Sequence, residues 1–212
     1  LNDQAGLLRH LFQGYGNEIA VSALPKQSRL KQIWLRNYIE SRGGFEVTWS
    51  ALKEFVRQID EAGRGELRIS EQMELRLWRG TIYVENNISQ YEQTIPTLVL
   101  DCREDFSLRL PTGKLKLSCN ESSDALAFKC PQSLSLSSSS EVRSLRHLGK
   151  EKSLKMLFAE KNVPPWRRKN WPVLSCEEGP VIIPNVAVHD DHWVDTTRRK
   201  GQSIRYLSFS AT

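Results

Sequence analysis

The first sixty residues carry apolar side chains at helical spacing, in three groups. The first is a short stripe from Leu7 to Phe12, and the second begins after Pro25 and stops at Gly43. The second group is predicted to turn Leu30, Ile33, Trp34, Asn37 and Tyr38 inward and to project Arg29, Lys31 and Arg36 elsewhere. The spacing therefore predicts a helical beginning to the chain.

A third helix is predicted after Thr48, whose hydroxyl is suited to an N-cap. Its expected inward residues are Leu52, Phe55, Val56 and Ile59. From Leu67 to Val84 the apolar residues alternate with polar ones, which is typical of a strand and a hairpin that turns at Arg79-Gly80. Residues 1–87 are thus predicted to form a small helical domain with a strand cap, and residues 88–104 a linker.

The rest of the chain, residues 105–212, mixes short strands with one helix and is predicted to be a small mixed α/β domain. The strands are expected at 106–110 and 115–117 (a hairpin), 126–129, 172–174 and 181–188. Residues 133–140 contain six serines and two leucines, and this composition favours a mobile loop. Residues 196–212 could be an edge strand or a disordered tail. The fold class is α+β.

A short helix, a stop and a basic corner follow the serine-rich segment. Leu154, Leu157 and Phe158 share one helical face, and Asn162 suits the left-handed position after a helix. Two prolines then forbid continuation, and Trp166, expected to pack under the helix, is followed by three basic residues.

Positive charge is concentrated in this part of the chain. Residues 143–169 contain nine Lys or Arg and two Glu, a local excess of seven, whereas the whole chain carries +5. Local positive charge suggests a polyanionic partner, although a solvated surface that aids solubility has the same composition. The residues singled out as RNA contacts are Lys152, Lys155, Arg167, Arg168 and Lys169, with Arg29, Lys31 and Arg36 as secondary candidates.

Motifs for catalysis, membrane insertion and metal binding are missing from the sequence. It contains no Walker A loop, no dinucleotide-binding glycine pattern, no nucleophile elbow, no zincin motif and no apolar run of about 20 residues. His189-Asp-Asp-His192 offers metal-ligand residue types. The side chains of adjacent residues at a strand end point to alternate sides and do not converge easily on one ion, so a solvated loop is the preferred interpretation. The four cysteines form no C-x-x-C pair, so reduced thiols are expected, with a Cys119–Cys130 disulfide left open.

The basic corner resembles a known family. The run Ser153-Leu-Lys-x-Leu-Phe-x-x-x-x-Val-Pro-Pro-Trp-x-Arg168, followed by Pro172-x-Leu174, is similar to the C-terminal domain of bacterial tRNA(Ile)-lysidine synthetase. The helices from Arg29 and Thr48 and the strands up to Val84 resemble the middle, substrate-binding domain of that enzyme. Leu110-Pro-Thr-Gly113 resembles the join into its C-terminal region.

The resemblance implies a function. Enzymes of this family use ATP, with Mg²⁺, to activate C2 of the wobble cytidine in the CAU anticodon of tRNA(Ile), and free lysine then displaces AMP to give lysidine. Their catalytic S-G-G-x-D-S loop lies in an N-terminal domain and does not occur in this sequence. We therefore expect a piece of a longer, cytoplasmic enzyme that binds tRNA. The piece itself is expected to contain no catalytic site or cofactor and to bind neither membranes nor metals. A homodimer is a further expectation from the family.

One alternative from a different class remains at this point. Val163-Pro-Pro-Trp166 could serve as the docking corner of a protein–protein interaction module, which would be indifferent to RNA and to salt.

Overall fold

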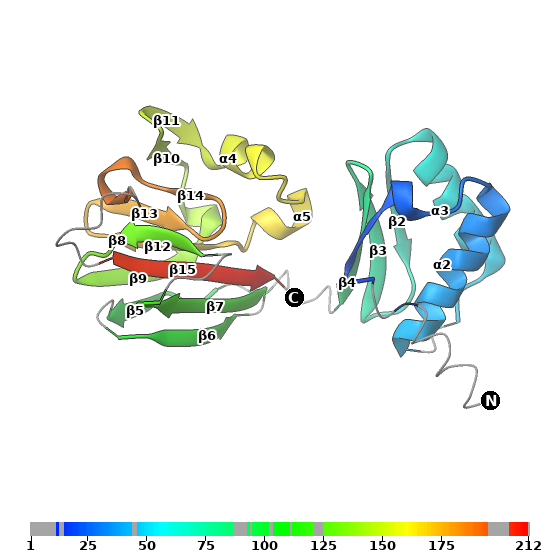
Figure 1. The fold of residues 1–212 in the computed structure, drawn as a ribbon, viewed down its shortest axis with the longest axis horizontal. Helices are drawn as coiled ribbons and strands as arrows, with labels where there is room; N and C mark the ends of the chain where they lie inside the picture. The colour runs from blue at the N-terminus through cyan, green and yellow to red at the C-terminus, as the bar shows by residue number, and fades with distance from the viewer. Residues whose placement is uncertain are drawn as a thin grey trace. The chain divides into compact units, whose positions relative to one another are not determined.

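The computed structural model describes residue 12 and residues 15–43, 46–86, 93, 95–101, 104–110, 112–120, 125–194 and 204–211. The chain divides into two compact units, Leu1–Ile88 and Ser89–Thr212 (Figure 1). Helices and antiparallel strands occur in both units, and the predicted α+β class is confirmed. The predicted stripe that ends at Phe12 lies almost entirely outside the described residues.

The N-terminal unit packs two helices on one antiparallel sheet. Its elements are β1 (Glu18–Ala20), η1 (Val21–Ala23), α2 (Ser28–Gly43), α3 (Trp49–Glu61), β2 (Arg64–Arg68), β3 (Met73–Trp78) and β4 (Thr81–Asn86), with strand order β1-β4-β3-β2. Thr48 caps α3 by accepting from the Ala51 amide at 3.3 Å, as predicted. The inward residues predicted for α3 are all buried, and the β3–β4 hairpin turns at Arg79 and Gly80, which both have positive φ.

The inward face predicted for α2 is wrong in part. Leu30 and Ile33 are 46% and 39% exposed, whereas Leu35 and Ile39 are fully buried. The buried stripe also contains Lys31, which was predicted to point away. Its ammonium group donates to the carboxylate of Asp60 on α3, so a cation occupies a position that the apolar pattern could not identify.

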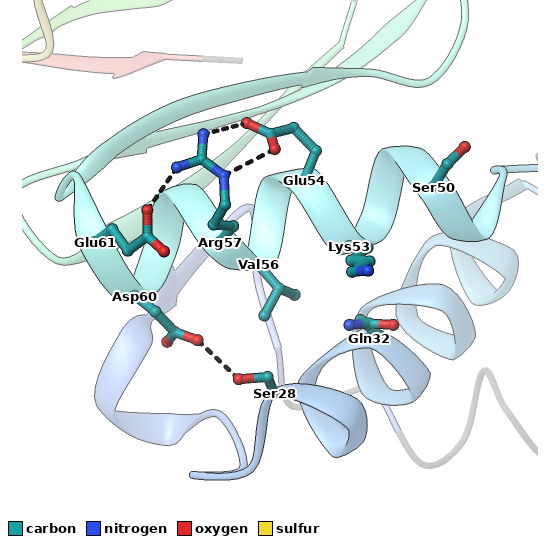
Figure 2. A pocket seen from close by; sticks show the side chains of 9 residues that line it. All are labelled: Ser28, Gln32, Ser50, Lys53, Glu54, Val56, Arg57, Asp60 and Glu61. Atoms are coloured by element: carbon teal, nitrogen blue, oxygen red, sulfur yellow. Dashed lines mark hydrogen bonds and ion pairs between the residues drawn. The ribbon is translucent and has the colours of Figure 1, made fainter.

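Carboxylates along α3 lie close to basic and hydroxyl groups (Figure 2). Arg57 pairs with both Glu54 (2.7 Å) and Glu61 (2.5 Å), and Asp60 accepts from Ser28 of α2 at 2.9 Å. The hydrogen bonds from Arg57, with help from Gln58, lower the pKa of Glu54 to about 2. The hydrogen bond from Lys31, despite some burial, likewise lowers the pKa of Asp60.

These shifts predict acid destabilisation of the N-terminal unit. Because the folded pKa values lie below the unfolded ones, the unfolded chain binds more protons in acid, and the stability that Glu54 contributes is lost as the pH falls from about 4.5 towards 2. The melting temperature of the unit, followed by circular dichroism between pH 6 and 2, should therefore fall. Glu54→Gln should flatten this dependence, whereas the control Glu71→Gln, at an exposed carboxylate without an ion pair among the described residues, should not. Equal slopes in all three proteins would contradict the prediction.

The C-terminal unit contains two antiparallel sheets and a separate hairpin. One sheet has the order β14-β13-β12-β9-β5 and the other the order β6-β7-β15-β8. The strands are β5 (Leu98–Asp101), β6 (Phe106–Leu110), β7 (Gly113–Ser118), β8 (Leu126–Lys129), β9 (Ser133–Ser138), β10 (Ser144–His147), β11 (Lys150–Ser153), β12 (Pro172–Cys176), β13 (Gly179–Ile183), β14 (Ala187–Val188) and β15 (Ile204–Ala211). The helices are η3 (Ser139–Glu141), α4 (Leu154–Glu160), α5 (Pro165–Arg168) and η4 (Asp190–His192).

One apolar core unites the two sheets with α4. Leu115 and Leu117 of β7 are buried, whereas Lys114 and Lys116, which alternate with them, are exposed, so this sheet has one face in the core and one in solvent. Leu134, Leu136, Val173 and Ile182 from the other sheet belong to the same cluster, as do Leu154, Leu157 and Phe158 of α4. Gly113 begins β7 with φ 153°, and a Cβ there would lie 2.3 Å from the Ser210 carbonyl oxygen, so only glycine fits.

Several predicted strands are confirmed in this unit, and others need correction. The hairpin at 106–117 and the strand at 126–129 are present. Residues 98–101, placed in the predicted linker, form β5 and pair with β9. The single strand predicted at 181–188 is two strands, β13 and β14, joined by a turn at 184–186. Of the two alternatives for the end of the chain, a strand is correct, but β15 lies between β7 and β8 and is not an edge.

The serine-rich segment is the clearest error of sequence interpretation. Residues 133–138 form β9, an interior strand between β12 and β5, and Ser138 and Ser139 are buried. Leu134 and Leu136 alternate into the core, which is the period of a strand, and the serine composition obscured that pattern.

Candidate nucleic-acid interface

The basic corner begins with the predicted helix and stop, and a second short helix, α5, follows that the sequence analysis did not predict. Ser153 caps α4 by accepting from the Met156 amide at 3.3 Å, and the apolar face of α4 is buried. Asn162 has φ 53°, the left-handed conformation that ends a helix, and the Val163 amide then donates to the Phe158 carbonyl at 2.9 Å. Proline at the start of α5 suits the first turn of a helix, which needs no amide donor there.

Side-chain hydroxyls from two distant segments hold the end of α5. Ser138 donates to the Lys169 carbonyl at 2.8 Å, and Ser139 donates to the carbonyls of Lys169 (3.1 Å) and Arg168. Thr112 donates to the Asn170 carbonyl at 3.2 Å. Three successive carbonyls at the end of α5 thus accept from side-chain hydroxyls, and the basic corner is fixed to β9 and to the start of β7. The serine-rich segment thus positions the corner.

Trp171, rather than Trp166, anchors the corner in the core. Trp171 is 7% exposed, its indole nitrogen donates to the Pro184 carbonyl at 3.0 Å, and its ring meets those of Phe158 and Phe209. Trp166, which was expected to pack under the helix, is half-buried.

The five principal residues predicted to contact RNA differ in accessibility. Lys155 and Lys169 are exposed. The Lys152 ammonium pairs with Glu160 at 2.9 Å, which neutralises its charge locally. Arg167 is only 8% exposed, and the Nε of the half-buried Arg168 donates to the Val163 carbonyl at 2.8 Å. Arg167 and Arg168 therefore belong to the structure of the corner more than to its surface.

The three secondary candidates lie in the N-terminal unit, on α2. Arg29 is exposed, whereas Lys31 is buried against Asp60. Arg36 pairs with Glu40 at 2.8 Å and lies over the ring of Trp49. Of these three, only Arg29 presents a cation without an ion pair among the described residues.

Four further exposed cations, which the sequence analysis did not select as contacts, come from the same part of the chain. Arg143, Lys150 and Lys161 are exposed, and Arg146, also exposed, lies 3.6 Å from Asp190. We define the cationic surface as Arg143, Lys150, Lys155, Lys161 and Lys169; within the part of the chain that the structure describes, none of these five forms an ion pair. All five come from the β10–β11 hairpin and the α4–α5 corner or from the residues beside them (Figure 1). The high density of lysine and arginine in residues 143–169 was the sequence signal that could have identified these cations.

The candidate metal motif does not bring its four residues together. His189 caps a turn of 3₁₀ helix that His192 ends, their rings are 6.2 Å apart, and His189 Nδ1 accepts from the Asp191 amide at 3.3 Å. Cys119, Cys130 and Cys176 are free thiols, as expected, so the alternative Cys119–Cys130 disulfide is not present. None of the helices in the described ranges is long and apolar enough to cross a bilayer.

The fold and the surface define a small α+β domain that displays lysines on a rigid hairpin–helix corner. Residues 133–206 match the family model of the TilS substrate C-terminal domain, TilS being tRNA(Ile)-lysidine synthetase. The match begins at β9, contains the whole corner and ends within β15.

A solved structure described as the crystal structure of the TilS C-terminal domain is also similar, with 18% sequence identity and a TM-score of 0.40. The similarity covers 55% of this chain and 98% of that one. No curated protein matches the sequence.

Proposed function

We propose that this chain is the tRNA-binding portion of a tRNA(Ile)-lysidine synthetase. The observation that carries the proposal is the family match over residues 133–206, because this segment contains both the cationic surface and the strand that holds it in place. Clustered lysines at fixed positions neutralise phosphates and orient a folded RNA without reading its bases.

In this proposal the two units have separate tasks. The C-terminal unit binds the tRNA through the cationic surface, and the N-terminal unit, with Arg29 exposed on α2, helps to position the body of the tRNA. The RNA is a tRNA(Ile) with a CAU anticodon. ATP, Mg²⁺ and lysine are handled by a catalytic domain that carries the S-G-G-x-D-S loop, and the whole enzyme works in the cytoplasm of a bacterium, with a homodimer as one form of assembly.

The test is the binding of the purified chain to a tRNA transcript at two salt concentrations. If the five cations of the cationic surface neutralise about four phosphates, the slope of log affinity against log salt is roughly −3 to −4, and affinity falls about 100-fold between 50 and 200 mM salt. Fluorescence anisotropy of an end-labelled tRNA measures this directly.

A comparison with an unstructured RNA tests whether the chain recognises folded tRNA. An unstructured RNA of the same length should bind more weakly than the tRNA, because a rigid surface recognises the spacing of phosphates in a folded RNA. Absent or salt-independent binding would refute the proposal, and it is the result expected of a protein–protein interaction module with a Val163-Pro-Pro-Trp166 docking corner.

A further inference from the structure

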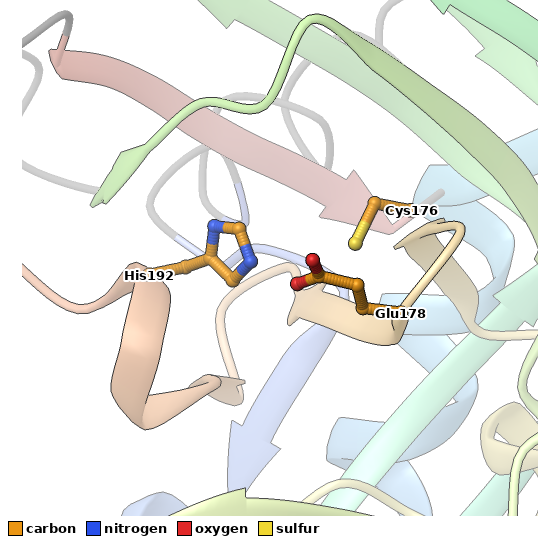
Figure 3. A group of neighbouring side chains, drawn as sticks. All are labelled: Cys176, Glu178 and His192. Carbon is orange, nitrogen blue, oxygen red and sulfur yellow. The ribbon is translucent and has the colours of Figure 1, made fainter.

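Three potential metal ligands meet at one end of the five-stranded sheet. Cys176 is the last residue of β12, Glu178 lies in the turn to β13, and His192 ends η4. One ligand atom from each lies within 4.8 Å of the other two (Figure 3). The cluster does not depend on the cationic surface, since it lies on other strands and contains none of its residues.

The position of His192 leaves one ring nitrogen ready to coordinate. Its Nδ1 lies 2.9 Å from the carbonyl oxygen of Lys129. A carbonyl can only accept, so Nδ1 carries the proton and Nε2 keeps a free lone pair. Figure 3 shows the ring nitrogen farther from the backbone turned towards Cys176 and Glu178. Metal-bound histidines are commonly oriented by this arrangement, in which the other nitrogen donates to a carbonyl.

The other two ligand atoms have no competing partners. Among the described residues, neither the Cys176 thiol nor the Glu178 carboxylate forms a hydrogen bond or an ion pair. The hairpin register pairs Cys176 with Gly179 and fixes the thiol, while Glu178 is exposed in the turn and can rotate. In a tetrahedral zinc site the ligand atoms are about 3.5 Å apart, so side-chain rotations, above all of the exposed Glu178, would bring the three ligand atoms to that spacing.

The surroundings leave room for a fourth ligand. A pocket of about 260 Å³ adjoins the three side chains and is also lined by Pro131, Gln132, Ser133 and Glu177. A mixed sulfur, nitrogen and oxygen set with one open position suits Zn²⁺ better than Mg²⁺ or Ca²⁺, which prefer oxygen alone.

We propose that Cys176, Glu178 and His192 bind one Zn²⁺ ion, with a water molecule as the fourth ligand. The ion would link the β12–β13 turn to η4. Zinc should therefore raise the melting temperature of the C-terminal unit, because it binds the folded chain in preference to the unfolded one.

The test is a titration of the whole purified chain with Co²⁺, a spectroscopic substitute for zinc. We expect one equivalent to bind, with visible bands of tetrahedral cobalt and a near-ultraviolet band from the thiolate, and Zn²⁺ should displace it. Cys176→Ser should abolish the thiolate band. Glu178→Gln and His192→Ala should each weaken binding at least 10- to 100-fold, the range already produced by changes outside the ligand shell.

Matched controls separate this site from adventitious binding. Glu141→Gln alters an exposed carboxylate that does not line this pocket, and Cys119→Ser removes another exposed thiol; both should bind Co²⁺ as the unmodified chain does. Glu178→Gln lies in an exposed turn and should fold, so the test does not depend on the cysteine variant. No stoichiometric binding, a spectrum without the thiolate band, or unchanged affinity in Glu178→Gln would overturn the proposal.

Discussion

Replacing Lys155 and Lys169 together by glutamate is expected to reduce the affinity of the chain for tRNA about 10- to 100-fold at 100 mM salt. Both lysines are exposed and, in the part of the chain that the structure describes, form no ion pair. Each contact with a phosphate contributes about one unit to the salt slope, so the double variant should lower that slope by about two as well as weakening binding. Fluorescence anisotropy across a salt series measures both effects.

A matched control is available in the same unit. Lys114 and Lys116 are exposed on the solvent face of β7, and their double replacement by glutamate changes the net charge equally. This control should bind tRNA within about threefold of the unmodified chain, because phosphate contacts act at short range in physiological salt. An equal loss in both double variants would mean that net charge, and not the cationic surface, governs binding.

Substitutions of Arg167 and Arg168, which the sequence analysis also selected, are expected to have a different effect. Arg167 is buried, and Arg168 donates to the Val163 carbonyl. Alanine at either position should therefore affect the stability of the corner as well as its binding. Lys155 and Lys169 are the cleaner test of RNA contact.

Trp171→Ala is expected to lower the free energy of unfolding of the C-terminal unit by about 3–5 kcal/mol, the range for removing a large buried aromatic residue. The ring packs on Phe158 of α4 and on Phe209 of β15, with ring centroids at 6.0 and 4.9 Å. The indole also donates to the buried Pro184 carbonyl, which would lose its partner. Because domains of this size are only about 5–15 kcal/mol stable, the loss should remove a large fraction of the stability of the unit.

Chemical denaturation followed by circular dichroism and by tRNA binding would measure this effect. The helices of the N-terminal unit should unfold at an unchanged denaturant concentration, since their apolar core is a separate cluster. Trp193→Ala is the control, because Trp193 is 54% exposed and its loss should cost less than about 1 kcal/mol. A small effect of Trp171→Ala would mean that the unit repacks around the cavity and that the corner does not depend on this anchor.

Much of the local structure could be predicted because neighbouring residues determine it. Thr48 caps α3 through an amide three residues away, and Asn162 ends α4 through its own backbone conformation. The strands at 106–110 and 126–129 follow from alternation and turn residues in a short window. The cationic character of the corner was likewise evident from the density of lysine and arginine.

Errors arose where a distant partner changed the meaning of a residue. The sequence pattern predicted that Lys31 projects from the surface. In the structure its ammonium donates to Asp60, 29 positions away, in the interface between the two helices. Cys176 and Glu178 had no evident connection with His192, because only the β12–β13 turn and η4 bring them together.

The sequence by itself determined where α3 begins and α4 ends, the α+β class and the concentration of positive charge, since these depend on short-range backbone preferences and on composition. Only the tertiary structure decided which lysines remain exposed and that the serine-rich segment holds the end of α5. The physical reason is that burial and hydrogen-bond pairing depend on the partner that folding brings into contact. In the unfolded chain the hydroxyls of Ser138 and Ser139 hydrogen-bond to water. In the folded chain they donate to the Lys169 carbonyl at 2.8 and 3.1 Å.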